Sequence, residues 1–180
     1  MKTNIKVVAL ILVLLIFVIF AVEGAAKMLH PLKYKDYVVK YSDKYDIDPY
    51  LVYSIIKAES SFKVDATSRG NARGLMQITD NTGKWAAEKM GLNEFKTEQL
   101  YDPEINISIG CWYLNRLYKQ FEASENVPEE LRKLVLASYN AGPTRVDTWL
   151  KDKSLSSSGH SLDEIPYKET ENYVKKVNNY

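Results

Sequence analysis

The sequence has few residues of the kinds that build metal or thiol chemistry. Its 180 residues include one cysteine and two histidines. A single thiol can form no disulfide within the chain, and neither His30 nor His160 lies near another set of metal-ligand residues. Cys111 falls on the apolar stripe of a predicted helix, so we expect a small buried side chain. The sequence therefore disfavours zinc and thiol mechanisms, and it predicts no metal and no organic cofactor.

An excess of basic charge is also missing. Lys and Arg number 24 against 23 Asp and Glu, which leaves a net charge of +1. Such a chain has no basic field that could hold nucleic acid, so no nucleic-acid partner is expected. Strand signals are nearly absent as well, and the best is a hairpin-like excursion over residues 68–78, with Gly70 and Gly74 as turn residues.

What the chain does have is one long apolar run near its start. Residues 7–22 are all apolar and follow Lys2 and Lys6, the pattern of an export signal or a short membrane anchor. We expect an anchor within residues 1–26, contacting the cytoplasmic membrane through residues 7–26, and a tether over 27–34. The domain at 35–180 would then lie outside the cytoplasm, in the cell envelope. A cleaved signal followed by secretion is the alternative.

The rest of the chain shows helical periodicity and helix-start signals. Asp48-Pro49 and Asp102-Pro103 are typical helix starts, and Thr79 or Asp80 can cap a further helix that Gly91 closes. We expect one mainly α domain with little or no sheet. The helices are predicted over 34–45, 49–60, a segment ending at 90, 103–121, 128–139, 144–150 and 168–178.

One glutamate occupies a position where an apolar residue is expected. Val52, Ile55 and Ile56 form one stripe of the predicted helix 49–60, and Glu59 continues that stripe. A carboxyl group partly removed from water holds its proton to higher pH, as a general acid must. The alternative is that Glu59 sits at the rim of the core and reaches solvent, as most glutamates in last turns do.

Four motifs follow one another from Glu59 onward. They are residues 59–62 (Glu-Ser-Ser-Phe), 68–78 (Ser-Arg-Gly-Asn-Ala-Arg-Gly-Leu-Met-Gln-Ile), 137–143 (Ala-Ser-Tyr-Asn-Ala-Gly-Pro) and 165–174 (Ile-Pro-Tyr-Lys-Glu-Thr-Glu-Asn-Tyr-Val). In this order and at these separations the chain resembles the SLT-type catalytic domain of the lytic transglycosylases over about residues 35 to 178. These bacterial enzymes have a lysozyme-like fold and cleave peptidoglycan glycan strands.

The resemblance implies a reaction and a set of site residues. The β-1,4 bond between N-acetylmuramic acid and N-acetylglucosamine is cleaved with formation of a 1,6-anhydromuramoyl product. Glu59 acts first as acid and then as base. The residues implied to bind substrate are Ser68, Gly74, Leu75, Met76, Gln77, Tyr139, Asn140 and Glu169. Several of these have structural alternatives: Gln77 could satisfy loop backbone, Asn140 could help to end a helix, and Glu169 could be a solvated first-turn residue.

Most glycosidases need a second carboxylate, and the candidates at a suitable distance in the sequence are Asp65 and Asp80. For Asp80 a helix cap is the favoured role. Two other functions stay open at this point. One is a goose-type muramidase, a hydrolase with one dominant glutamate, and the other is a catalytically inactive glycan-binding module. The apolar segment would also suit a partner role in a cell-wall or secretion machine.

Overall fold

The computed structural model describes residues 12–16, 32–122 and 127–180. The chain divides into two units, residues 1–35 and residues 36–180. In the first unit residues 12–16 are helical, with exposed side chains. Among the described residues, no helix combines the length and apolarity that crossing a membrane requires. The predicted anchor and tether lie outside the described residues except at 12–16 and 32–34, so both stay predictions.

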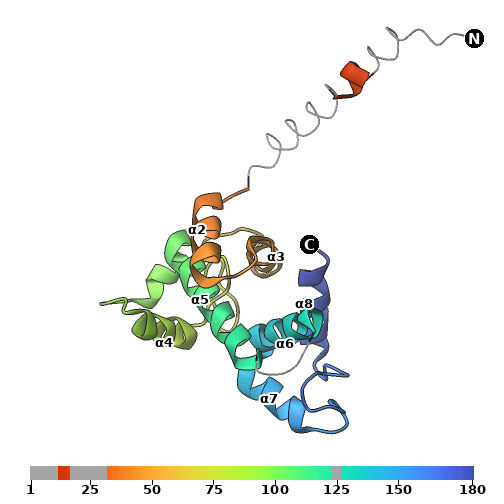
Figure 1. Ribbon diagram of the computed structural model, residues 1–180. Helices are drawn as coiled ribbons and strands as arrows, with labels where there is room; N and C mark the ends of the chain where they lie inside the picture. Colours follow the sequence, from red (N-terminus) through yellow and green to blue (C-terminus); the bar gives the residue numbers. More distant parts are fainter. Residues whose placement is uncertain (1–11, 17–31, 123–126) are drawn as a thin grey trace, which may run out of the picture. The chain divides into compact units, whose positions relative to one another are not determined.

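The second unit is built from helices (Figure 1). Their bounds are α2 Lys35–Tyr45, α3 Pro49–Glu59, α4 Asp80–Met90, the 3-10 helix η1 Thr97–Tyr101, α5 Pro103–Phe121, α6 Pro128–Ala141, α7 Pro143–Lys151 and α8 Lys168–Asn178. Each predicted helix is present, with ends that differ by two residues or fewer. No pattern in the sequence predicted η1.

Local capping explains where the helices around the site begin. Asp48 accepts a hydrogen bond from the amide of Tyr50 at the start of α3, and Asp102 does the same for Ile105 at the start of α5. The cap of α4 is Thr79, whose hydroxyl accepts from the amide of Thr82. The alternative cap at Asp80 was therefore wrong. Gly91, in the left-handed conformation, ends α4 as predicted.

The core is centred on α6, which contacts α5, α7 and α8 and lies between α5 and α8 in Figure 1. Four successive residues of α6 are fully buried: Leu134, Val135, Leu136 and Ala137. A helix buried all round in this way needs partners on several sides. Because α8 also packs against α3, the end of α3 is brought close to one face of α8.

Two further predictions are confirmed. The segment 68–78 contains isolated antiparallel bridges between Thr67 and Arg73 and between Arg73 and Ile78, which is a hairpin-like turn without a regular sheet. Cys111 is fully buried in α5, and this burial raises the pKa of its thiol to about 12. A thiol of that kind stays protonated at neutral pH and is a poor nucleophile.

Candidate active site

Glu59 is the last residue of α3, and the rest of its stripe is core. Val52, Ile55 and Ile56 are fully buried, while Glu59 is only partly exposed. Burial raises the pKa of its carboxyl from 4.5 to about 7. The direction is the one expected for a carboxyl in an apolar setting. At neutral pH a large share of Glu59 is therefore protonated, which gives the site a proton donor.

Helix α8 supplies three groups that act on Glu59. Glu169, Tyr173 and Lys176 are spaced as i, i+4 and i+7, so they share one face of the helix. The hydroxyl of Tyr173 and the charge of Lys176 lower the pKa of Glu59, whereas the charge of Glu169 raises it. Tyr173 and Glu59 form a polar contact that falls short of standard hydrogen-bond geometry. Burial outweighs the two lowering effects, so the pKa stays high.

Tyr139, near the end of α6, lies beside the same carboxyl. Its hydroxyl donates a hydrogen bond of 2.8 Å to the carbonyl oxygen of Met76. Burial and the negative charge of Glu59 together raise the pKa of Tyr139 well above its ordinary value. Tyr139 therefore joins the turn at 68–78 to the neighbourhood of Glu59. Its predicted contact with substrate stays a prediction.

The Gly-Leu-Met-Gln turn (residues 74–77) is held in place by Asn106, a residue outside the four motifs. Asn106 is fully buried in α5 and donates to the carbonyl oxygens of Arg73 (2.9 Å) and Leu100 (2.7 Å). Its own oxygen accepts from the amide of Met76 (2.8 Å). A polar residue flanked by Ile105 and Ile107 in a buried helix was the available signal.

Three of the predicted substrate-binding residues in this turn are buried. Gly74 has φ +74°, and a Cβ there would lie 2.2 Å from the carbonyl oxygen of Leu100 and 2.4 Å from Nδ2 of Asn106. Glycine is thus required for packing against α5 and η1. The side chains of Leu75 and Met76 are fully buried. These three residues therefore shape the turn, and their predicted contact with substrate stays a prediction.

Gln77 and Ser68 both make local hydrogen bonds. The Gln77 amide donates to the carbonyl oxygens of Ala66 (3.1 Å) and Gly74 (2.9 Å), which is the structural role left open for it. Its Oε1 is the atom that could contact a sugar. Ser68 is exposed, and its hydroxyl accepts from the amide of Ala72 at 3.0 Å. That bond shapes the turn, and the predicted contact of Ser68 with substrate stays a prediction.

A cavity of about 250 Å³ brings the second and third motifs together. It is lined by Gln77, Ile78, Thr79, Thr82, Tyr113, Tyr139, Asn140, Ala141 and Gly142. The side-chain oxygen of Asn140 accepts a hydrogen bond of 2.8 Å from Thr170, a buried residue of α8. This bond ties the fourth motif to the third. The second and third motifs therefore line the cavity, the fourth is joined to it through Asn140, and Tyr139 is shared between the cavity and the neighbourhood of the carboxyl.

The candidates for a second carboxylate are engaged or exposed. Asp80 forms a two-point ion pair with Arg73, at 2.8 and 3.1 Å. Asp65 is exposed in the irregular stretch after α3. Neither contributes to the pKa shift of Glu59. Within the part of the chain that the structure describes, no group of His, Cys, Asp and Glu is arranged to hold a metal ion.

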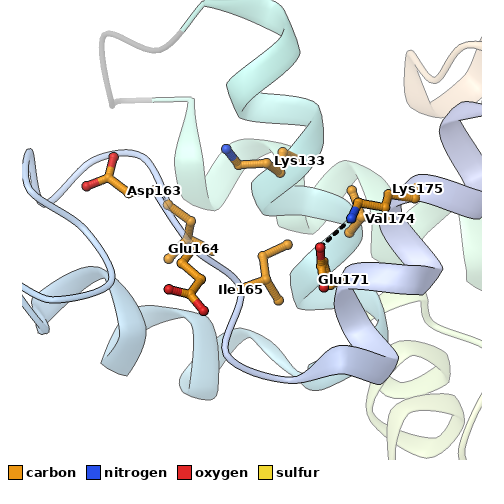
Figure 2. Close-up of a pocket in the computed structure, with 8 residues that line it drawn as sticks. Lys133, Asp163, Glu164, Ile165, Glu171, Val174 and Lys175 are labelled. Atoms are coloured by element: carbon orange, nitrogen blue, oxygen red, sulfur yellow. Dashed lines mark hydrogen bonds and ion pairs between the residues drawn. The ribbon is translucent and has the colours of Figure 1, made fainter.

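A second cavity, of about 270 Å³, lies on another side of α8 (Figure 2). Glu171, Val174 and Lys175 line it from α8, Lys133 from α6 and Glu164 from the preceding loop. Three of its charged groups form ion pairs: Lys133 with Glu130, and Glu171 with Lys168 and Lys175. The contacts with Lys168 and Lys175 lower the pKa of Glu171 to about 2. No residue that acts on Glu59 lines this cavity.

Comparison with known proteins identifies the family of this domain. Residues 36–159 match the family model of the transglycosylase SLT domain. The chain belongs to this family. Over 149 residues it is 34% identical to the soluble lytic murein transglycosylases of Salmonella typhimurium and Escherichia coli K12, covering 82% of this chain. It is 31% identical over 167 residues to the membrane-bound lytic murein transglycosylase C of Pectobacterium atrosepticum, covering 81% of this chain.

Solved structures resemble the SLT domain in the same region. The 70 kDa soluble lytic transglycosylase of Escherichia coli matches with a TM-score of 0.69 at 34% identity, over 82% of this chain and 23% of that one. An inactive variant of the lytic transglycosylase Slt of Pseudomonas aeruginosa, with glutamine in place of a glutamate, matches with a TM-score of 0.67 at 30% identity, over 84% of this chain and 24% of that one. The predicted fold class, a mainly α lysozyme-like domain with little or no sheet, is confirmed.

The SLT domain makes up only part of these relatives. This chain spans 22% of the length of the Salmonella typhimurium and Escherichia coli K12 proteins and 45% of the Pectobacterium atrosepticum protein. The family is therefore shown for residues 36–159, and the roles of single residues rest on the geometry described above.

Proposed function

We propose that this SLT domain is a peptidoglycan lytic transglycosylase that cleaves the β-1,4 bond between N-acetylmuramic acid and N-acetylglucosamine. The observation that carries the proposal is Glu59, a partly buried carboxyl with a pKa of about 7 beside the cavity residue Tyr139. The names of the relatives, which are lytic murein transglycosylases, support the same reaction class.

In the first step Glu59 acts as the general acid. The protonated carboxyl gives its proton to the glycosidic oxygen as the bond from that oxygen to the anomeric carbon breaks. A carboxyl with an ordinary pKa would be almost fully ionised at neutral pH and could not do this. The relative from Pseudomonas aeruginosa, inactive when one glutamate is replaced by glutamine, supports an essential glutamate in this chain as well.

In the second step the C6 hydroxyl of the same muramic acid residue attacks the anomeric carbon. The new bond closes a 1,6-anhydro ring, and the hydroxyl proton passes to the carboxylate of Glu59, which is then ready for another cycle. An internal nucleophile is already close to its target, so no second carboxylate is needed to activate water. The ion pair of Asp80 and the exposure of Asp65 fit this scheme.

Hydrolysis by a goose-type muramidase mechanism is the competing reaction. It would need a group that activates water, and Glu169 is the carboxylate whose charge reaches Glu59. Glu169 is exposed, and we therefore favour its predicted role at the substrate cleft over a role as base. The two reactions give products of different mass.

We also propose that the domain works outside the cytoplasm, where peptidoglycan lies. The apolar residues 7–22 support a membrane anchor within residues 7–26, and secretion after signal cleavage is the alternative. Relatives named soluble and relatives named membrane-bound are both found in the family. A partner in the cell wall or in a secretion machine fits this position.

The test is mass spectrometry of the fragments that the purified protein releases from peptidoglycan. We expect muropeptides about 18 Da lighter than hydrolytic products, because internal closure adds no water. Glu59→Gln should lower release by about 10²- to 10⁴-fold, since the amide donates no proton. Glu129→Gln, at an exposed glutamate in the first turn of α6, is the matched control and should cleave normally. Products with hydrated reducing ends would instead identify a muramidase, and no release by the unmodified protein would favour a binding module.

A further inference from the structure

Helix α4 continues one wall of the 250 Å³ cavity outward. Thr79, the cap of α4, and Thr82, in its first turn, both line the cavity. Trp85 follows Thr82 by three residues, so the two side chains are neighbours on one face of the helix. The surface of α4 that begins at the cavity therefore continues to the ring of Trp85.

The ring of Trp85 also continues a row of aromatic side chains. Tyr139, beside Glu59, lies with its ring centre 5.6 Å from that of Tyr113, and Tyr113 lies 6.3 Å from Trp85. Tyr139 and Tyr113 line the cavity, and Trp85 is the next ring outward. The row leads from the neighbourhood of the carboxyl along the cavity to the surface of α4.

Trp85 is held firmly although it is open to solvent. Its side chain is 38% exposed, whereas Trp149 is 6% exposed. Trp85 contacts Trp112 edge to face at 4.9 Å and Tyr113 nearly perpendicularly. Two ring contacts fix its orientation, so little conformational entropy is lost when a ligand stacks on it. Aromatic side chains commonly line ligand sites, and Trp85 directly adjoins the cavity residue Tyr113.

We propose that Trp85 forms a further sugar subsite, which takes an N-acetylhexosamine ring of the glycan strand lying beyond the cavity. Pyranose rings present C–H groups on their faces, which stack on an aromatic ring, and their polar edges stay in water. The occupant is a sugar of the same strand because the aromatic row is continuous with the cavity at Tyr113. This inference rests on the proposed function.

The test compares oligosaccharides of different length. Chitin oligomers from disaccharide to hexasaccharide are titrated calorimetrically into Glu59→Gln protein, with and without Trp85→Ala. Oligomers that reach beyond the cavity should lose about tenfold in affinity when Trp85 is replaced, while the shortest should bind equally. Trp85→Phe should show a smaller loss confined to the same long oligomers, and it tests the subsite even if Trp85→Ala does not fold.

Tyr50→Ala is the matched control, because Tyr50 is a 76% exposed aromatic residue that does not line the cavity. It should bind every oligomer as the parent protein does. An equal loss at all lengths, or no loss at any length, in the Trp85 variants would overturn the subsite. In either case cleavage of peptidoglycan by the unmodified protein would still support the proposed function. If the unmodified protein neither cleaves peptidoglycan nor binds an oligomer, both proposals fail.

Discussion

The ammonium group of Lys176 on α8 donates a hydrogen bond of 2.7 Å to the carbonyl oxygen of Ala58, the residue before Glu59. This bond fastens α8 to the last turn of α3, where carbonyl groups lack partners within the helix. It also holds a positive charge near the carboxyl of Glu59, and that charge lowers the pKa of the carboxyl. Lys176 therefore both positions the proposed acid and limits how far burial raises its pKa.

Removing the charge of Lys176 should move the pH profile of cleavage to higher pH. The acid must be protonated, so activity falls as the pH rises through the pKa of Glu59, about 7. Lys176→Gln removes a positive charge that favours the carboxylate, so the pKa of Glu59 should rise. The pH at which activity falls, the falling limb of the pH profile, should then move to higher pH. Lys176→Arg keeps the charge and should leave the limb in place.

Glu169→Gln provides a change of opposite sign. The negative charge of Glu169 raises the pKa of Glu59. Removing that charge should therefore shift the falling limb to lower pH. The measurement is the rate of glycan release across the pH range for all the variants. If the falling limbs of the Lys176→Gln, Glu169→Gln and unmodified proteins lie at the same pH, Lys176 and Glu169 act on structure or substrate binding and not on the charge of Glu59. Tyr173 and Tyr139, which also face the carboxyl, stay unchanged in every variant.

The buried carboxyl should lower the stability of the folded protein at high pH. The pKa of Glu59 is about 7 in the folded state against an ordinary value of 4.5. Protonated Glu59 therefore favours the folded state, and this contribution is complete below pH 4.5 and is lost as the pH rises through about 7. Glu59→Gln does not titrate, so it should be more stable than the unmodified protein above about pH 8, by at most about 3 kcal/mol.

Urea denaturation near pH 5 and near pH 8 measures this difference in the free energy of unfolding. The advantage of Glu59→Gln should grow between the two conditions. Glu88→Gln, at a glutamate with a 73% exposed side chain, should show no comparable growth. An advantage that does not change with pH would mean that Glu59 has an ordinary pKa in the folded state.

Features that depend on neighbouring residues were predictable from the sequence. The Asp-Pro starts of α3 and α5 and the stripe that ends in Glu59 are local patterns, and each appears as predicted. Contacts between distant segments were not predictable in this way. Lys176 is 118 residues from Ala58, and nothing in the composition of α8 shows which of its lysines faces α3. The burial of Leu75 and Met76 likewise depends on how the turn packs against α5.

Gly74 should be far less tolerant of substitution than Gly70, in the same turn. A Cβ at Gly74 would collide with the carbonyl oxygen of Leu100, and its φ of +74° strains any other residue. At Gly70 the nearest atom to an added Cβ is the hydroxyl of Ser68, at 3.8 Å, an ordinary contact. Gly74→Ala should cost about 2 to 4 kcal/mol of stability, and Gly70→Ala less than about 1 kcal/mol. Thermal denaturation of the two variants makes the comparison, and equal losses would contradict the packing described for Gly74.

Asn106 should matter for both stability and cleavage, although it is not expected to touch substrate. Asn106→Ala leaves two buried backbone groups without a partner, the carbonyl group of Leu100 and the amide of Met76. The carbonyl group of Arg73 loses one hydrogen bond but keeps that from the amide of Ile78. Each unpaired buried group costs about 1 to 3 kcal/mol, so the loss in free energy of unfolding should be at least about 2 kcal/mol.

The effect of Asn106→Ala on cleavage follows from the contact between Met76, which Asn106 holds, and Tyr139. The carbonyl of Met76 accepts the hydrogen bond of Tyr139, so a displaced turn should move Tyr139 away from its place beside Glu59. We expect Asn106→Ala to lower the rate of cleavage even at temperatures where it is fully folded. Asn115 lies elsewhere on α5 and donates one hydrogen bond to the carbonyl oxygen of Tyr45. Asn115→Ala should lose about 1 kcal/mol of the free energy of unfolding and keep its rate of cleavage. If the two variants cleave equally when folded, Asn106 supports the fold alone and the turn does not depend on it for its catalytic geometry.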